Sequence, residues 1–341
     1  MELRKVQLTG GSSITVTLPK TWVEKLKVRA GDVVGCQEQP DGSLAIYPHA
    51  KAERALQVYE IEVEGDKPNY LFRKIVAAYL MGFDAIRLNA RRGLDGPSRQ
   101  IIRQAVRRII GLEITDEQTN SITIQDFLDP REFQLEKALR RMGMLCQAMQ
   151  QEAFQNLREP KVDAVQSAED RDDEVDRLYW LASKQYHAIL RDSTYGSKMG
   201  LNAGQALNYL LAARLVERTA DHADRVTHEA MQLSSLKGSQ SFRERMGKEF
   251  KVASDLFQLA LTNFHKRDAR AANQIIEDAT KFLDGQKKLL QEAAEFGGEP
   301  VSHLAFIIES IMRTAAYAAD VAEVAINHKV ATEERLVTPE K

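Results

Sequence analysis

The sequence has few cysteines and no long apolar run. Only two of its 341 residues are cysteine, Cys36 and Cys146, and they are too few and too far apart for a disulfide framework or a paired-cysteine metal site. No stretch approaches the roughly 18 uninterrupted apolar residues of a membrane-spanning helix. The first residues also lack the apolar core of a signal peptide. We therefore expect a soluble, cytoplasmic protein with both thiols reduced.

Sequence signatures of catalysis and of a polybasic arm are missing as well. The net charge is −2, made up of +1 over residues 1–50, zero over 51–130 and −3 over the remainder. There is no glycine-rich phosphate loop and no nucleophile elbow, and the acidic segments contain no Glu-x-x-His pair of the kind used by di-iron oxidases. His187, His265 and His303 are isolated, which is typical of packing or surface histidines. We expect no enzyme.

Residues 1–50 have the pattern of a small β-rich module. Short β-branched runs at 5–8 and 14–18 flank a turn rich in glycine and serine, and a short helix is expected after Pro19. Two further runs, 33–37 and 44–47, are expected to form a hairpin. A module of this size buries little core alone, so we expect a homodimer or higher homo-oligomer.

The order of these parts resembles the AbrB/MazE/SpoVT family of swapped-hairpin modules. The matching features are RKVQL, a glycine-rich loop, TLPK, a short helix, RAGD and a closing strand that ends in YP. The resemblance implies a dimer that grips DNA through Arg4, Lys5 and Lys20. Ser12-Ser13 and Val23-Glu24 stand where DNA-binding relatives often carry arginines. The alternative is therefore a module that only dimerises.

Residues 51–130 alternate between strand and helix patterns in the order β-α-β-α-β-β. Four strands and two helices are expected, at 55–64, 69–81, 83–89, 101–110, 112–116 and 121–125. This layout suggests a linker domain that is a ferredoxin-like or related α/β sandwich.

The second helix of this region carries a row of arginines. Arg99, Arg103, Arg107 and Arg108 could contact nucleic acid or an anionic ligand. The other interpretation is a solvated face paired with nearby acids such as Glu113 and Asp116. We prefer it because the charge of the region balances.

From residue 131 the pattern becomes helical, with long amphipathic segments separated by short breaks. The expected helices are 131–158, 161–192, 199–236, 241–267, 269–296 and 300–328, followed by a flexible tail over 329–341. Long helices joined by short loops are antiparallel neighbours, so we expect two three-helix bundles.

Two helices of the first half carry acidic stripes. Glu217, Asp221 and Asp224 follow a helical spacing, with His228 one turn further on, and the preceding helix repeats the spacing through Glu169, Asp172 or Asp173, and Asp176. Like charges four residues apart destabilise a helix, so either water screens these stripes or a cation compensates them. Carboxylates suit hard cations, and a histidine would extend the choice to iron, zinc or manganese.

An internal repeat relates the two halves of the helical region. Residues 216–230 can be laid over 311–325 with a constant offset, which matches Arg218-Thr219-Ala220 to Arg313-Thr314-Ala315. Under this alignment the three acidic residues of the first half fall on Met312, Ala316 and Ala319. We therefore expect one acidic face and one that has lost its acidic residues.

The acidic strings DDEVD at 172–176 and ERTADHAD at 217–224 resemble PhoU, the phosphate-uptake regulators. The resemblance spans about 130–328, and together with the preceding modules it resembles the archaeal members. It implies two three-helix bundles, binding of iron, zinc or a similar metal, control of phosphate transport or phosphate-responsive transcription, and no catalysis. The residues that it implies as metal ligands are Asp172, Asp173, Asp176, Glu217, Asp221 and Asp224.

Two functions follow from these resemblances. The first is a dimeric regulator that senses phosphate status and acts at DNA through its N-terminal module. The alternative is an adaptor that contacts a phosphate transporter or another protein, with an N-terminal module that only dimerises it.

Overall fold

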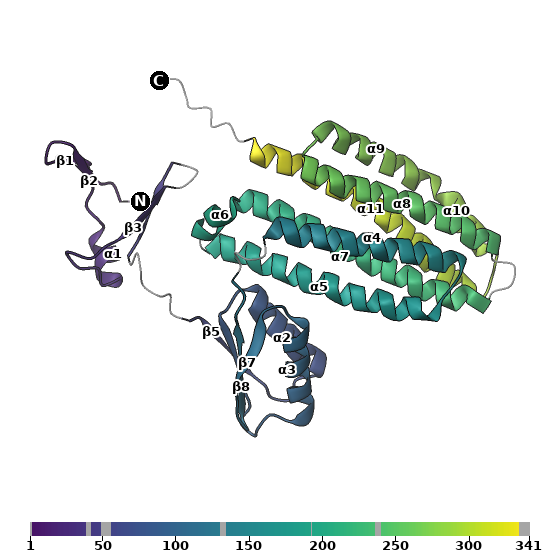
Figure 1. Cartoon of the computed structure of the whole chain (residues 1–341), viewed down its shortest axis with the longest axis horizontal. Helices are drawn as coiled ribbons and strands as arrows, with labels where there is room; N and C mark the ends of the chain where they lie inside the picture. The colour runs from purple at the N-terminus through teal and green to yellow at the C-terminus, as the bar shows by residue number, and fades with distance from the viewer. Residues whose placement is uncertain are drawn as a thin grey trace. The chain divides into compact units, whose positions relative to one another are not determined.

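The chain divides into two compact units, residues 1–56 and 57–341 (Figure 1). The computed structural model describes residues 2–38, 42–48, 56–129, 134–191, 193–235 and 240–333. Among these residues we find no helix whose length and hydropathy would suit a membrane crossing.

The N-terminal unit contains two separate two-stranded sheets and one short helix. β1 (Gln7–Thr9) pairs antiparallel with β2 (Ser13–Thr15), α1 (Lys20–Lys25) follows Pro19, and β3 (Gly35–Glu38) pairs antiparallel with β4 (Leu44–Tyr47). Gly10 and Gly11 form the first turn with φ of 64° and 86°, a conformation that glycine adopts without steric cost. The predicted order of elements is confirmed.

The first strand starts later than the sequence predicted. The ladder between β1 and β2 begins at the pair Gln7 and Thr15, because β2 ends there. Arg4 and Lys5 consequently precede the strand instead of lying in it.

Apolar side chains of the N-terminal unit remain in contact with solvent. None of its residues whose exposure is described is buried, and Ile14 on β2 is 74% exposed. Further exposed apolar residues of this unit are Leu3, Val6, Leu8, Val33 and Leu44. A protomer therefore forms no hydrophobic core from the described part of this unit.

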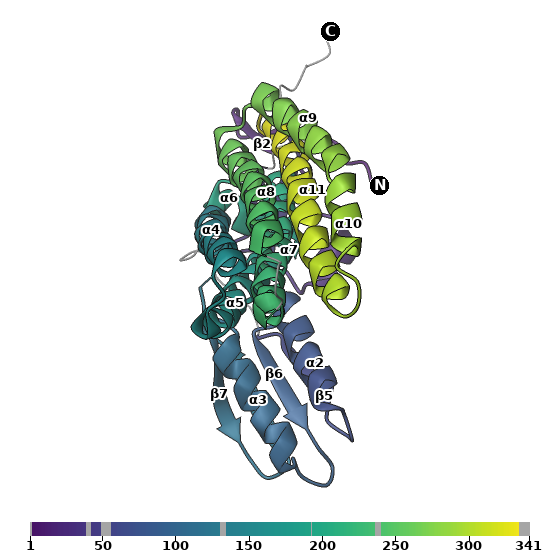
Figure 2. The same cartoon turned by 90° about the vertical axis from the view of Figure 1, so that its right-hand side faces the viewer.

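Residues 57–129 form a two-layer α/β region. Its elements are β5 (Val58–Glu62), α2 (Pro68–Leu80), β6 (Ala85–Asn89), α3 (Gly96–Arg108), β7 (Leu112–Glu117) and β8 (Ser121–Asp126). Both helices cover the same face of the four-stranded sheet (Figure 2). Leu71, Ile75, Ile86, Ile102 and Ile124 are among the residues of its core.

The strand order departs from the ferredoxin-like arrangement suggested by the sequence. The order is β5-β6-β8-β7, with β5 and β6 parallel neighbours and the other pairs antiparallel. A ferredoxin-like domain follows β-α-β-β-α-β with a strand inserted between its parallel pair. Here α3 comes before β7, and the short turn after Glu117 joins β7 and β8 as a hairpin. β8 therefore pairs with the free edge of β6.

The helical region contains the six predicted long segments. They are α4 (Leu135–Arg158), α5 (Val162–Arg191), α7 (Ala203–Gln232), α8 (Gln240–Lys266), α9 (Ala269–Gly285) with α10 (Lys287–Ala294), and α11 (Pro300–Thr332). The structure adds a short helix, α6 (Ser193–Met199), and a 3₁₀ turn over Leu233–Ser235, and it divides the fifth segment at Gln286. α11 continues four residues beyond its expected end, and residues 334–341 of the expected tail lie outside the described residues.

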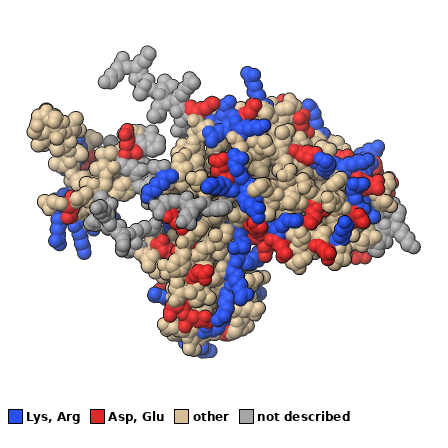
Figure 3. All heavy atoms as spheres, viewed as in Figure 1, with Lys and Arg blue, Asp and Glu red and all other residues tan. Residues whose placement is uncertain are grey.

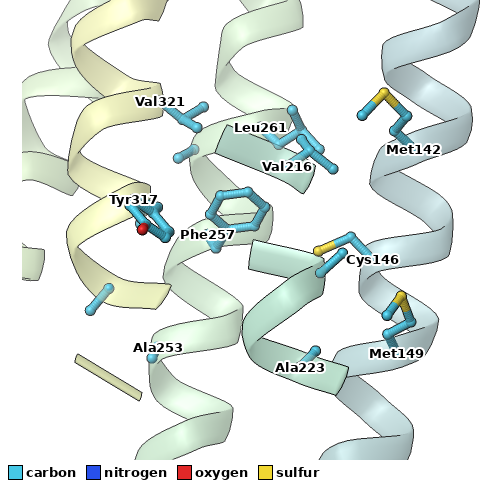
Figure 4. Close-up of a cluster of buried hydrophobic side chains, with 14 of the residues drawn as sticks. Met142, Cys146, Met149, Val216, Ala223, Ala253, Phe257, Leu261, Tyr317 and Val321 are labelled. Carbon is cyan, nitrogen blue, oxygen red and sulfur yellow. The ribbon is translucent and has the colours of Figure 1, made fainter. Parts of the chain in front are cut away.

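The long helices pack as two three-helix groups that share one core. α4, α5 and α7 pack together, as do α8, α9 and α11, while α7 contacts α11 and α4 contacts α8. Phe250, Phe257 and Phe264 follow a seven-residue spacing on α8 and are fully buried. Figure 4 shows Phe257 among side chains of several helices, including Val216 and Tyr317. Truncating such a phenylalanine to alanine costs about 3–5 kcal/mol.

Candidate functional site

Five carboxylates meet where α5 and α7 pack side by side. Asp172 and Asp176 lie one turn apart on α5, and Glu217, Asp221 and Asp224 lie along α7. We call these five residues the acidic cluster. Charges from all four other members act on Asp172, so the two predicted stripes do face each other.

Burial and mutual repulsion raise the pKa values of the acidic cluster. Burial, together with the charges of Asp221, Asp176, Asp224 and Glu217, raises the pKa of Asp172 to about 8. The same two causes raise the pKa of Glu217 to about 7, and that of Asp176 to about 6. The pKa of Asp224 is raised chiefly by burial. Asp221 is exposed, but desolvation of its carboxylate still raises its pKa, and its charge raises the pKa values of Asp172, Asp176 and Glu217.

Two oxygens of the acidic cluster have no hydrogen-bond partner among the described residues. Glu217 Oε2 and Asp224 Oδ1 are both buried from solvent. The other oxygen of Glu217 accepts a hydrogen bond from Arg214 Nη1 at 2.9 Å. A buried carboxylate oxygen without a partner is costly, and a bound cation or a proton would lower that cost.

His228 lies at one end of the acidic cluster. Its Nε2 is 3.4 Å from Glu169 Oε1 and 3.6 Å from Asp224 Oδ1. The helical spacing on α7 already placed His228 on this line. His222 points elsewhere, as expected from its position beside Asp221, and its Nδ1 lies 3.1 Å from Ser310 Oγ on α11.

Asp173 lies outside the acidic cluster, although the sequence grouped it with the other ligands. Its side chain is 53% exposed and pairs with Arg108, the last residue of α3. Arg108 Nη2 is also 3.7 Å from Asp176 Oδ2. In Figure 3, basic side chains run over α3 toward acidic side chains at the edge of the helical region.

Arg99, Arg103 and Arg108 of α3 are paired with acids, as expected, but with partners different from those predicted. Arg99 and Arg103 both bond to Glu117, rather than to Glu113 or Asp116. Glu117 ends β7, which brings its carboxylate alongside the first turns of α3. Arg108 reaches α5 instead, a contact that needs the packing of the α/β region on the helices.

No three carboxylate, histidine or cysteine side chains in the described part of the chain already stand around a common point as metal ligands. The acidic cluster is therefore not a preformed coordination cage. Metal binding would require its side chains to change rotamer, and Asp221 is the member that is exposed to solvent.

The second half repeats the helix packing without the acidic residues. Thr219 and Thr314 occupy equivalent places on α7 and α11, both fully buried, and each hydroxyl donates to the carbonyl four residues earlier. Ala316 and Ala319 take the places of Asp221 and Asp224 under the same offset. The backbone repeat is thus kept while the carboxylates are lost.

The basic residues of the N-terminal unit are exposed. Lys20 lies 3.8 Å from Glu24 on α1, and Arg4 pairs with Glu2. Lys5 lies between Arg4 and the first strand and is exposed. These contacts leave the three residues accessible to an anionic partner, while Glu2 and Glu24 partly neutralise two of them.

A separate cavity of about 400 Å³ lies at the carboxyl ends of β5 and β6. Its lining includes Asp66, Arg92 and Asp95, and Arg91 lies 3.3 Å from Glu64 within it. The Asp95 carboxylate already caps α3 by accepting from the Ser98 amide. Charges of both signs thus compensate each other within the cavity, and no residue of the acidic cluster lines it.

Comparison with known proteins matches two parts of the chain. Residues 139–230 match the family model of the PhoU domain, and residues 7–54 match that described as "Antidote-toxin recognition MazE, bacterial antitoxin". The crystal structure of PhoU from Pseudomonas aeruginosa aligns with a TM-score of 0.47 and 18% identity, over 57% of this chain and 94% of that chain. A search of curated proteins found no match.

The first of these matches contains α5 and the acidic residues of α7, and the second contains β1 to β4. The two resemblances found in the sequence are therefore confirmed. The chain therefore combines a PhoU domain over residues 139–230 with a MazE-like N-terminal domain.

Proposed function

We propose that this protein is a metal-binding regulator of phosphate uptake whose acidic cluster holds the metal. The observation that carries the proposal is the meeting of five carboxylates on α5 and α7, two of which have buried oxygens without a partner. Like charges so placed repel one another, and a multivalent cation relieves both the repulsion and the missing bonds.

The donor set suits a hard or borderline cation. All five side chains offer oxygen, which favours iron, manganese or calcium, and His228 adds a nitrogen that suits iron or zinc. When bound, the metal supplies positive charge that neutralises the cluster. Asp172, Asp176, Glu217, Asp221 and Asp224 would hold it, and His228 with Glu169 would bind at one end.

Metal content measured on untagged protein tests this site. The double variant Asp176→Ala/Asp221→Ala removes one carboxylate from each helix and is expected to lose most of the bound metal. Glu277→Ala/Asp278→Ala, on α9 in the second half, is a matched control with the same charge change and is expected to keep it. Equal metal content in all three proteins would rule out the acidic cluster.

We further propose that the regulator acts at DNA through its N-terminal domain. The match to a MazE antitoxin domain and the exposure of Arg4, Lys5 and Lys20 support this. In a dimer these residues would provide about six phosphate contacts, enough for a steep salt dependence of affinity.

An adaptor that contacts a phosphate transporter is the second candidate. It is favoured by Glu2 and Glu24, which pair with Arg4 and Lys20 and reduce the positive charge available to DNA. A mobility shift with DNA from upstream of the coding sequence separates the two functions. DNA binding predicts that Arg4→Ala/Lys5→Ala lowers affinity while metal content stays unchanged. Absence of wild-type binding at low salt would favour the adaptor.

A further inference from the structure

Arg108 belongs to the α/β region, but its guanidinium lies beside the acidic cluster. It is the last residue of α3, and its guanidinium pairs with Asp173 and lies 3.7 Å from Asp176 Oδ2 on α5. These partners are 65 and 68 positions away in the sequence. Asp176 is thus shared between the acidic cluster and an arginine from another layer of the fold.

Aromatic side chains hold the guanidinium in this position. The Arg108 guanidinium carbon is 5.6 Å from the centre of the Phe72 ring and 5.8 Å from that of Trp180. The two rings meet edge to face at 5.9 Å. Cation–π contacts of this kind are typical of arginine. The arginine is therefore packed by both layers and is not a freely moving surface side chain.

We propose that Arg108 is a tethered counter-cation of the acidic cluster and sets its affinity for metal. The proposal rests on the metal site proposed above. A metal ion and the guanidinium both require the negative charge of Asp176, and two cations at one carboxylate repel each other. Metal therefore binds fully only when Arg108 withdraws from Asp176, so the arginine lowers metal affinity.

The coupling must act in both directions. If Arg108 weakens metal binding, bound metal weakens the contact of Arg108 with α5 by the same factor. Other contacts also keep the α/β region docked, among them the pair of Lys184 with Asp126 and the hydrogen bond that Arg191 Nη2 donates to the Gly82 carbonyl at 3.0 Å. Metal binding is thus expected to loosen the C-terminal end of α3 without releasing the whole region.

Zinc titration of the full-length protein with two readouts tests the proposal. Zinc has a filled d shell, so it does not quench tryptophan through unpaired electrons. In a Trp22→Phe background Trp180 is the remaining tryptophan and lies against Arg108. Calorimetry gives the zinc affinity, and Trp180 emission reports whether the guanidinium leaves the ring.

Three variants separate charge from packing. Arg108→Gln removes the competing charge and is expected to bind zinc about tenfold more tightly, with little zinc-dependent change in Trp180 emission. Arg108→Lys keeps the charge and is expected to remain close to wild-type affinity. Arg103→Gln, on the same helix as Arg108, loses a contact with Glu117 of β7 and is the matched control.

The outcomes distinguish the two proposals. Tighter zinc binding in Arg108→Gln alone, together with a zinc-dependent change of Trp180 emission in the parent protein, supports the counter-cation. Equal zinc affinity in the parent and Arg108→Gln, with unchanged emission, overturns the role of Arg108 and leaves the metal site in place. No saturable zinc binding to the parent protein overturns the metal site itself.

Discussion

The ammonium group of Lys184 on α5 and the carboxylate of Asp126 at the end of β8 form an ion pair that is almost completely shielded from water. Their side chains are 5% and 8% exposed. Lys184 Nζ also lies 4.7 Å from the centre of the Tyr79 ring, on the opposing α2. The pair therefore joins β8 and α2 of the α/β region to α5 of the helical region.

Removing one member of this pair should strongly destabilise the protein. Lys184→Met leaves the Asp126 carboxylate buried and unpaired, which is expected to lower the free energy of unfolding by about 3–5 kcal/mol. Urea denaturation measures this loss. Lys184→Met/Asp126→Asn should recover part of it, because a neutral amide can still accept from the Leu128 amide. If Lys184→Met were as stable as the wild type, the pair of Lys184 and Asp126 would not stabilise the fold.

Metal affinity should rise with pH up to about 8. The folded-state pKa values of Asp172, Glu217 and Asp176 are about 8, 7 and 6, so protons occupy the acidic cluster at neutral and lower pH. Metal must displace them, roughly two per ion near pH 6.5 if all three carboxylates bind. Zinc affinities measured at pH 6, 7 and 8 check this dependence.

The Asp172→Asn variant is the control for this pH dependence. It removes the group that loses its proton near pH 8, so the rise in zinc affinity between pH 7 and 8 should become smaller. The dependence between pH 6 and 7 should remain, because Glu217 and Asp176 still titrate there. A pH-independent affinity in wild type would exclude these carboxylates as ligands.

Two histidines whose rings contact the Phe264 ring, His265 and His328, should make the fold sensitive to acid. His328 is buried, neither of its ring nitrogens has a hydrogen-bond partner among the described residues, and its ring stacks on Phe264 with 4.7 Å between ring centres. Burial lowers the pKa values of His328 and His265 to about 4. The unfolded chain takes up these protons near pH 6.5, so both groups reduce stability as pH falls from about 6.5 to 4.

Replacing His328 should reduce that acid sensitivity. His328→Phe keeps the stacked ring and removes the titrating group, so its advantage over wild type should grow as the pH decreases. Both proteins must be compared at each pH, since the acidic cluster responds with opposite sign: its raised pKa values favour the folded state on acidification. Parallel stability profiles for His328→Phe and wild type would contradict this prediction.

Deleting residues 1–56 should convert an oligomer into a monomer. The described part of the N-terminal unit buries no side chain, whereas residues 57–341 form a compact unit with their own cores. Light scattering of the full and shortened chains measures the change of mass. Leu259→Glu, an exposed position on α8, is the control and should stay oligomeric. An unchanged mass after deletion would place the interface elsewhere.

The sequence alone determined the elements and the composition of each face. Helical periodicity identified the long segments, because a buried stripe repeats every 3.6 residues. The same spacing placed Asp172 and Asp176 on one line and Glu217, Asp221 and Asp224 on another. Alternating strands and turns predicted the order of the α/β region. These are local properties, set within a few turns of each residue.

Tertiary structure decided which faces meet. The strand order of the α/β region depends on the pairing of β8 with the free edge of β6. No local sequence pattern specifies that pairing. The two aspartates Asp172 and Asp173 look equivalent in sequence, yet helix packing turns the first toward α7 and leaves the second to Arg108. Burial and charge repulsion together raise the pKa values of the acidic cluster. Both depend on which groups are close in space, not on which groups are close along the chain.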